Sequence, residues 1–98
     1  MTCITIHSPA TAAAIGGIVD LTNYDDGMLF ADGLAGAEEV DIFVMGGQTL
    51  IPYTVGTTVQ KLTATAPMLV LQPGVTYSVS KDATVGACGV YVHVSPKN

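Results

Sequence analysis

The sequence predicts an all-β protein: an antiparallel β-sandwich, jelly-roll-like or immunoglobulin-like, or a small barrel, of about eight strands. Short apolar runs recur every ~8–12 residues and are separated by turn-forming pairs such as Gly46-Gly47 and Pro73-Gly74. The chain has 98 residues, of which 49% are hydrophobic, so it can build one core. We therefore expect a single β-sandwich domain over residues 1–98.

The first predicted strands are short and are separated by proline- and glycine-containing turns. We expect one at Cys3–His7, ended by Ser8-Pro9 because proline cannot donate to a strand ladder. A second strand is expected at Ile18–Thr22. Asp25-Asp26-Gly27 is typical of a tight hairpin turn, in which glycine takes a positive φ, and Met28–Ala31 is the expected returning strand.

Val40–Met45 gives the clearest strand pattern of the first half. Its alternating positions are largely apolar on both sides after Asp41, which predicts a strand that is buried on both faces or lies at an interface. Gly46-Gly47 should form a hairpin turn to a partner at Gln48–Thr54, which Pro52 restricts to a sheet edge or a bulge. Thr57–Leu62 alternates only weakly.

The last third of the chain reads as a three-strand meander that organises the fold. Met68–Leu71 is a continuous apolar run, which predicts a strand at the centre of the sandwich. Val75–Ser80 alternates between apolar and polar residues, as in a half-solvated antiparallel strand. Gly89–Val94 places three valines on one face, and Tyr77 and Tyr91 would be cross-strand neighbours.

Charge is scarce and unevenly distributed. Charged residues make up 11% of the chain, against roughly 25% in ordinary soluble domains, so the exterior suits a protein that is partly covered by its own copies or by a larger assembly. Residues 1–49 carry seven acids and no lysine; residues 50–98 carry three lysines and one acid. The net charge of −5 and the absence of arginine argue against nucleic-acid or anionic-membrane partners.

No targeting segment is recognisable at the N-terminus, and no apolar run approaches the ~18–20 residues that span a bilayer. We therefore expect synthesis in the cytosol. The two cysteines are then expected to be reduced.

The search for chemistry leaves weak candidates. Cys3, His7, Cys88 and His93 would form a zinc site if the terminal strands paired, but residues 88 and 93 fall on opposite faces of a strand. The acids from Asp20 to Asp32 lack the spacing of a calcium loop. Neither a Gly-x-Ser-x-Gly elbow nor a phosphate-binding glycine loop occurs. We expect no metal, no cofactor and no enzymatic activity.

The run GVTYSVSKDATVGACGVYVHV, residues 74–94, resembles the ending of small tailed-bacteriophage capsid decoration (cement) proteins. The shared features are a Pro-Gly turn, a Gly-x-x-Tyr-x-Val-x-Lys strand, a loop of small residues and a final Gly-Val-Tyr-Val strand. The resemblance covers about the last quarter of the chain. It implies a structural virion protein, made in the host cytoplasm, that binds the major capsid protein on the capsid surface and stabilises the capsid, commonly as a homotrimer.

The acidic loops and the two-sided strand are the expected contact region. The predicted interface residues are Val40, Ile42, Phe43, Val44, Met45, Asp25 and Asp26. The alternative function is a glycan- or receptor-binding β-sandwich of a virion fibre or adhesin. In that case the sugar-binding face would be lined by Tyr24, Tyr53, Tyr77 and Tyr91.

Overall fold

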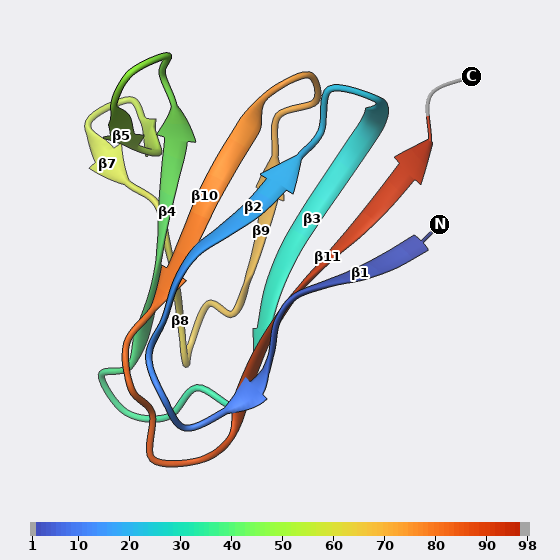
Figure 1. Ribbon diagram of the computed structural model, residues 1–98. Coiled ribbons are helices and arrows are strands. Elements are labelled where there is room, and N and C mark those ends of the chain that lie inside the picture. Colours follow the sequence, from blue (N-terminus) through green and yellow to red (C-terminus); the bar gives the residue numbers. More distant parts are fainter. Residues whose placement is uncertain (1, 97–98) are drawn as a thin grey trace.

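Two antiparallel sheets face each other and enclose the core (Figure 1). The computed structural model describes residues 2–96, and within them the first sheet has the strand order β1-β11-β3-β9 and the second β2-β10-β4-β5. Strand β8 also pairs with β4, and β6 pairs with β7 in a small hairpin. The strands are β1 (Thr2–Ala10), β2 (Ala14–Asp20), β3 (Tyr24–Asp32), β4 (Glu39–Met45), β5 (Leu50–Pro52), β6 (Thr54–Val55), β7 (Thr58–Val59), β8 (Lys61–Thr63), β9 (Met68–Leu71), β10 (Thr76–Lys81) and β11 (Cys88–Pro96).

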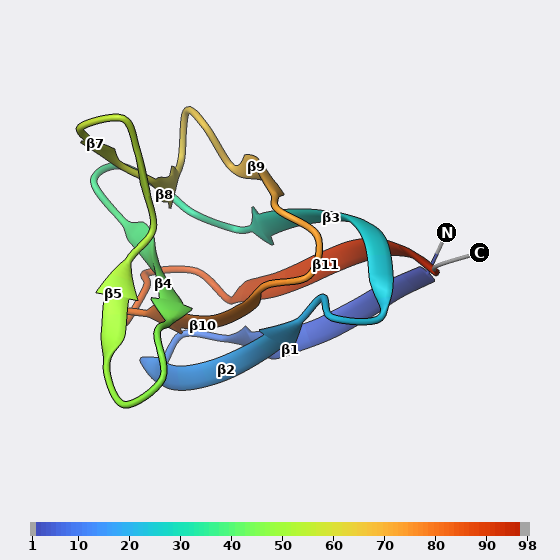
Figure 2. The same ribbon diagram turned by 90° about the horizontal axis from the view of Figure 1, so that it is seen from above.

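The strand order is that of a jelly roll. The first four strands pair in reverse order with the second half of the chain: β1 with β11, β2 with β10, β3 with β9, and β4 with β5 and β8. This long ribbon is wound so that β11 also pairs with β3 and β10 with β4. Seen from above, β3 and β11 lie in one layer and β2, β10 and β4 in the other (Figure 2). The prediction of an all-β antiparallel sandwich is confirmed, and the jelly-roll alternative describes its topology.

Alternation along the strands fills the space between the sheets. In β11, Cys88, Val90, Val92 and Val94 are buried, as the sequence predicted for the valines, and Tyr91 and His93 lie on the opposite face. The inward positions of the other strands obey the same period of two. The core consists of Val19, Leu21, Leu29, Ala31, Val40, Ile42, Tyr53, Leu62, Leu71, Tyr77, Val79, Cys88, Val90, Val92 and Val94.

Two predicted turns are confirmed. Gly47 and Gly74 both have positive φ, +84° and +79°, in the loops where Gly46-Gly47 and Pro73-Gly74 predicted turns. The first joins β4 to β5, and Pro52 lies in β5 at the end of the strand order, where a residue without an N–H is tolerated.

The first strand is longer than predicted, because Pro9 does not end it. Strand β1 continues to Ala10, and its register against β11 shifts between Thr5 and His7 and again between His7 and Ala10. These irregularities and the edge position of β1 accommodate the proline. His7 points inward, and its Nε2–H donates to the carbonyl oxygen of Val79 in the opposite sheet at 2.9 Å.

The predicted hairpin at Asp25-Asp26-Gly27 is wrong, since these residues lie within β3. The chain turns instead at Thr22, whose N–H and hydroxyl both donate to Asp20 Oδ1, at 3.0 and 2.7 Å. Strands β2 and β3 belong to different sheets. A Cβ at position 27 would lie 2.6 Å from Cδ1 of Leu21, so a larger residue there would force the buried Leu21 side chain to shift.

The predicted meander is also wrong. Strands β9, β10 and β11 do not pair with one another, and β9 is the edge of its sheet, with Met68 and Val70 exposed at 60% and 69%. The continuous apolar run belongs to an edge strand whose outer face is also apolar. The sequence pattern of such a strand is the same as that of a central strand buried on both faces. Tyr77 therefore lies in the opposite sheet from Tyr91. Ser78, which the alternation placed on the polar face of a half-solvated strand, is buried.

A buried lysine connects the β1–β2 and β10–β11 regions at one end of the sandwich through hydrogen bonds. Lys81 is 2% exposed, and its Nζ donates to the carbonyl oxygens of Ala10 at 3.0 Å and Ala12 at 2.6 Å. Thr84 adds a bond from its N–H to the carbonyl of Thr11 at 2.8 Å. The connections β1–β2 and β10–β11 are thus held together by donors at the end of β10 and in the loop that follows it, and by acceptors at the end of β1 and in the loop that follows it.

Candidate functional site

The predicted interface strand divides between core and surface. Val40 and Ile42 in β4 are 0% and 1% exposed and belong to the core, so their side chains cannot contact a partner. Val44 is half-buried and packs against the core, whereas Phe43 and Met45 lie on the outer side of the second sheet. The expectation of a strand buried on both faces holds for the inner face only.

The two predicted acidic contact residues lie elsewhere. Asp25 and Asp26 are exposed near the beginning of β3 in the first sheet, and β4 belongs to the second. The structure therefore does not bring them together with Phe43 and Met45 in one sheet surface. Whether any of these residues forms an interface stays a prediction.

A different surface gathers apolar side chains across the whole first sheet. Leu29 and Ala31 face the core in β3, so their neighbours in sequence point outward, and the register carries this surface across all four strands. Each of the two rows contains one residue from every strand. The first row is Thr5, Tyr91, Phe30 and Met68; the second is Cys3, His93, Met28 and Val70. We call these eight residues the Phe30 face.

Aromatic stacking orders the centre of the Phe30 face. The Phe30 ring lies 5.3 Å from the Tyr91 ring and 4.9 Å from the His93 ring, with interplanar angles of 26° and 16°. Met68 and Val70 stay more than half exposed beside this stack. None of the eight residues is an acid, a lysine or an arginine, and Asp26 and Asp32 lie just beyond the two rows. Soluble monomers rarely expose large contiguous apolar patches, and no acid, lysine or arginine interrupts the two rows of this face.

The segment that contains β5 and β7 lies beside the end of β4 (Figure 1), and its exposed side chains form a second apolar surface. We call residues 46–60, which contain β5, β6 and β7, the arm. The arm has no charged residue, and four of its large apolar side chains are about half exposed: Leu50, Ile51, Val55 and Val59. Its base is held by Tyr53, which is buried in the core and whose N–H donates to the carbonyl of Ile42 at 2.9 Å.

A shallow apolar groove lies at the base of the arm. Its volume is about 390 Å³, and its lining includes Val44, Ile51, Val75 and the two buried tyrosines, Tyr53 and Tyr77. The tyrosine rings meet edge to face with centroids 5.3 Å apart. The Tyr77 hydroxyl accepts from the N–H of Gln72 at 2.9 Å, and burial raises the pKa of this phenol. These tyrosines are packed into the fold rather than displayed on its surface.

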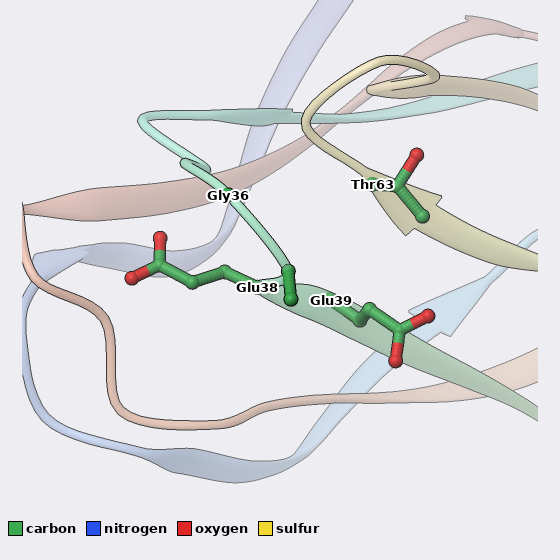
Figure 3. A pocket seen from close by; sticks show the side chains of 5 residues that line it. Gly36, Glu38, Glu39 and Thr63 are labelled. Atoms are coloured by element: carbon green, nitrogen blue, oxygen red, sulfur yellow. The ribbon is translucent and has the colours of Figure 1, made fainter.

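The acids at the opposite end do not converge on one point. Figure 3 shows the Glu38 and Glu39 side chains pointing away from each other. The two Glu38 oxygens accept from the N–H groups of Ala35 at 2.8 Å and Val85 at 2.7 Å, which closes the loops. Glu39 lies 3.5 Å from Lys61 Nζ, and this carboxylate, followed by Asp41, raises the pKa of the lysine. The Glu38 carboxylate therefore joins two loops, and the Glu39 carboxylate forms an exposed ion pair.

The four zinc candidates are separated. Cys3 and His93 oppose each other across the β1–β11 ladder on the Phe30 face, whereas His7 points inward and Cys88 is buried where it pairs with neither. Within residues 2–96, no group of three or more histidine, cysteine, aspartate or glutamate side chains is placed to hold a metal ion.

Family models, curated proteins and solved structures offered no match to this chain. The part of the chain described here includes no helix long and apolar enough to cross a membrane.

The sequence interpretation missed the Phe30 face because its rows join four strands that are distant in the chain. A local pattern was present: Met28 and Phe30 alternate with Leu29 and Ala31, and Tyr91 and His93 alternate with valines. Both sets of positions are apolar or aromatic in these segments. Only the jelly-roll order places these outer positions side by side.

Proposed function

We propose that this chain is a structural virion protein that binds the outside of an assembled phage capsid and stabilises it as a homotrimer. The observation that carries the proposal is the Phe30 face: eight outward side chains, none of them formally charged, on one sheet of a 98-residue domain. Such a surface supports a role in an assembly, because an apolar surface gives an isolated monomer no advantage in water. The resemblance of residues 74–94 to capsid decoration proteins supplies the kind of assembly.

The jelly-roll order is compatible with this role, since the same architecture occurs in viral capsid proteins and in lectins. Fold alone does not decide between those functions. A decoration protein needs contact surfaces and no reaction centre. By binding only the assembled lattice it would stabilise each site by RT ln(1 + [L]/Kd), about 2.7 kcal/mol at a hundredfold excess over Kd.

The test has two parts, capsid binding and oligomeric state. The chain is incubated with expanded capsids assembled from the capsid protein of the same genome, and separately with unassembled capsid protein. We expect it to co-sediment with the capsids and to raise their thermal disruption temperature. Failure to bind the capsids would refute the role. Sedimentation velocity of the chain alone should show a species of three copies, and a monomer at every concentration would refute the trimer.

The glycan-binding alternative is tested on the same material. Binding to a glycan array that is lost in Tyr24→Ala or Tyr91→Ala, together with no binding to capsids, would favour it. These two tyrosines are chosen because they are partly exposed, whereas Tyr53 and Tyr77 are buried.

A further inference from the structure

We infer that copies of this chain associate head to tail, with the arm of one copy covering the Phe30 face of the next. The inference rests on the oligomer part of the proposed function and names the two surfaces that would form the contact. Both surfaces are apolar, and neither contains an acid, a lysine or an arginine. The occupant that we assign to the Phe30 face is a second copy of the same chain, for three reasons.

Charge is the first reason for this choice of surfaces. Each copy carries −5, so two copies repel each other wherever their acids come close. Seven of the eight acids lie at or near the ends of strands, with Asp20, Asp25 and Asp26 at one end of the sandwich and Asp32, Glu38, Glu39 and Asp82 at the other; the eighth, Asp41, lies within β4. A contact between the Phe30 face and the arm keeps acids of one copy away from acids of the next.

The second reason is that a face-to-face pair would be worse. Asp26 and Asp32 lie at the two margins of the Phe30 face in the same strand. Superposing two such faces strand on strand would bring the acidic margins of both copies together, and the arms would stay exposed. A head-to-tail contact covers both apolar surfaces in every copy, and such contacts close into rings when the rotation allows.

Size is the third reason. The Phe30 face is four strands wide, and three strand spacings amount to about 14 Å. The β6–β7 part of the arm is a two-stranded hairpin, with Val55 and Val59 exposed at 56% and 49%. Asp26 and Asp32 are six residues apart along β3, which is about 20 Å, whereas the two strands of a hairpin are about 5 Å apart, so a hairpin laid across the four strands fits between these two acids.

Three exposed valines provide matched variants. Val70→Glu places a charge on the Phe30 face, Val55→Glu places one on the arm, and Val85→Glu is the control, at a residue that is 91% exposed and outside both surfaces. All three side chains are more than half exposed, so the variants should fold, which circular dichroism verifies. Met68→Glu and Val59→Glu replace either test variant that does not fold.

Sedimentation velocity then compares each variant alone with an equimolar mixture. At concentrations where the unmodified chain and Val85→Glu associate, Val70→Glu and Val55→Glu alone should be monomers. Their mixture should form a species of two copies, because the intact arm of Val70→Glu can still cover the intact face of Val55→Glu. No further copy can be added, since the remaining surfaces both carry the new charge.

Three outcomes would overturn the inference. Association of Val55→Glu alone to the same size as the unmodified chain would mean that the arm is not used. A mixture that stays monomeric would show that the two surfaces do not meet. An unmodified chain that is monomeric at every soluble concentration would remove the contact altogether. Open filaments of the unmodified chain would support the contact and refute the trimer. Capsid binding by a chain that stays monomeric would support the capsid-binding role while refuting both the trimer and this contact.

Discussion

The two outer faces of the sandwich are built alike and differ in chemistry. The Phe30 face joins outward residues from all four strands of the first sheet and contains no acid or lysine. On the second sheet, one outward row runs from Ser80 through Asp41 to Lys61, whose Nζ lies 3.6 Å from Asp41 Oδ1. Its neighbouring row combines Ile18, Ser78 and Phe43.

This difference shows which features the fold itself requires. Both sheets need apolar inward residues, and both have them. Outward residues only need to be compatible with water, and the second sheet combines one row of hydroxyl and paired charged side chains with a neighbouring row that includes Ile18 and Phe43. The two outward rows of the first sheet, which contain no acid, lysine or arginine, are not required by the core, and the proposed contact with another copy would give them a role.

The largest expected effect separates the two sides of one strand. Leu29 faces the core and is 0% exposed, and Phe30 follows it on the outer face. Leu29→Ala should lower the free energy of unfolding by about 2–5 kcal/mol, through lost burial and the cavity left behind. Phe30→Ala should cost the dilute monomer less and should weaken association, as urea denaturation at two protein concentrations measures. Equal losses in the dilute monomer would place Phe30 in the core.

The next comparison concerns two lysines near the second sheet. Lys81→Met should destabilise the chain because the carbonyls of Ala10 and Ala12 lose a charged donor, and a hydrogen bond from a charged group contributes about 1.5–3 kcal/mol. Lys61→Met removes an exposed ion pair on the outer face and should change stability far less. Thermal and urea unfolding of both variants measure the difference. A Lys61→Met loss as large as that of Lys81→Met would contradict this assignment.

A smaller effect is expected from acid, at Asp20 at the end of β2 in the second sheet. Hydrogen bonds from the N–H and hydroxyl of Thr22 lower the pKa of Asp20 below its usual 3.8. Because the folded-state pKa is the lower one, the stabilisation is complete above the unfolded pKa and is lost as the pH falls through the folded value. The urea midpoint should therefore fall on acidification below pH 4, and Asp20→Asn should remove this part of the slope. An unchanged slope in the variant would assign it to other acids.

The sequence was sufficient for the fold class and for several local features. Strand periodicity identified the inward valines of β11, and glycine chemistry identified the turns at Gly47 and Gly74. These features depend on residues that are close in the chain. Asp25-Asp26-Gly27 failed because a turn-forming composition does not force a turn: Gly27 serves to admit the Leu21 side chain.

The candidate site was less predictable because it depends on pairing between distant strands. Phe30 joins Tyr91 and Met68 through register alone, and each lies more than 20 residues from the next along the chain. The meander expected for β9–β11 would have placed Tyr91 next to Tyr77 and dispersed the face. In the predicted interface strand, the inward side chains of Val40 and Ile42 were needed by the core. Two-sided apolar strands do not reveal which side meets a partner.

The smallest expected effect is a change in the labelling rate of a cysteine, which measures whether the Phe30 face is covered. Cys3 lies on the face and is exposed, whereas Cys88 is buried and burial raises the pKa of its thiol. Under native conditions a thiol reagent should therefore modify one residue per chain, Cys3, and reach Cys88 only on unfolding, since the thiolate is the reacting form. Labelling of Cys3 should slow as protein concentration rises and the face becomes covered. In Val70→Glu, which keeps Cys3 but should not associate, the labelling rate should be independent of concentration. A rate that is equally constant in the unmodified chain would mean that Cys3, and with it the β1 side of the face, stays open to solvent.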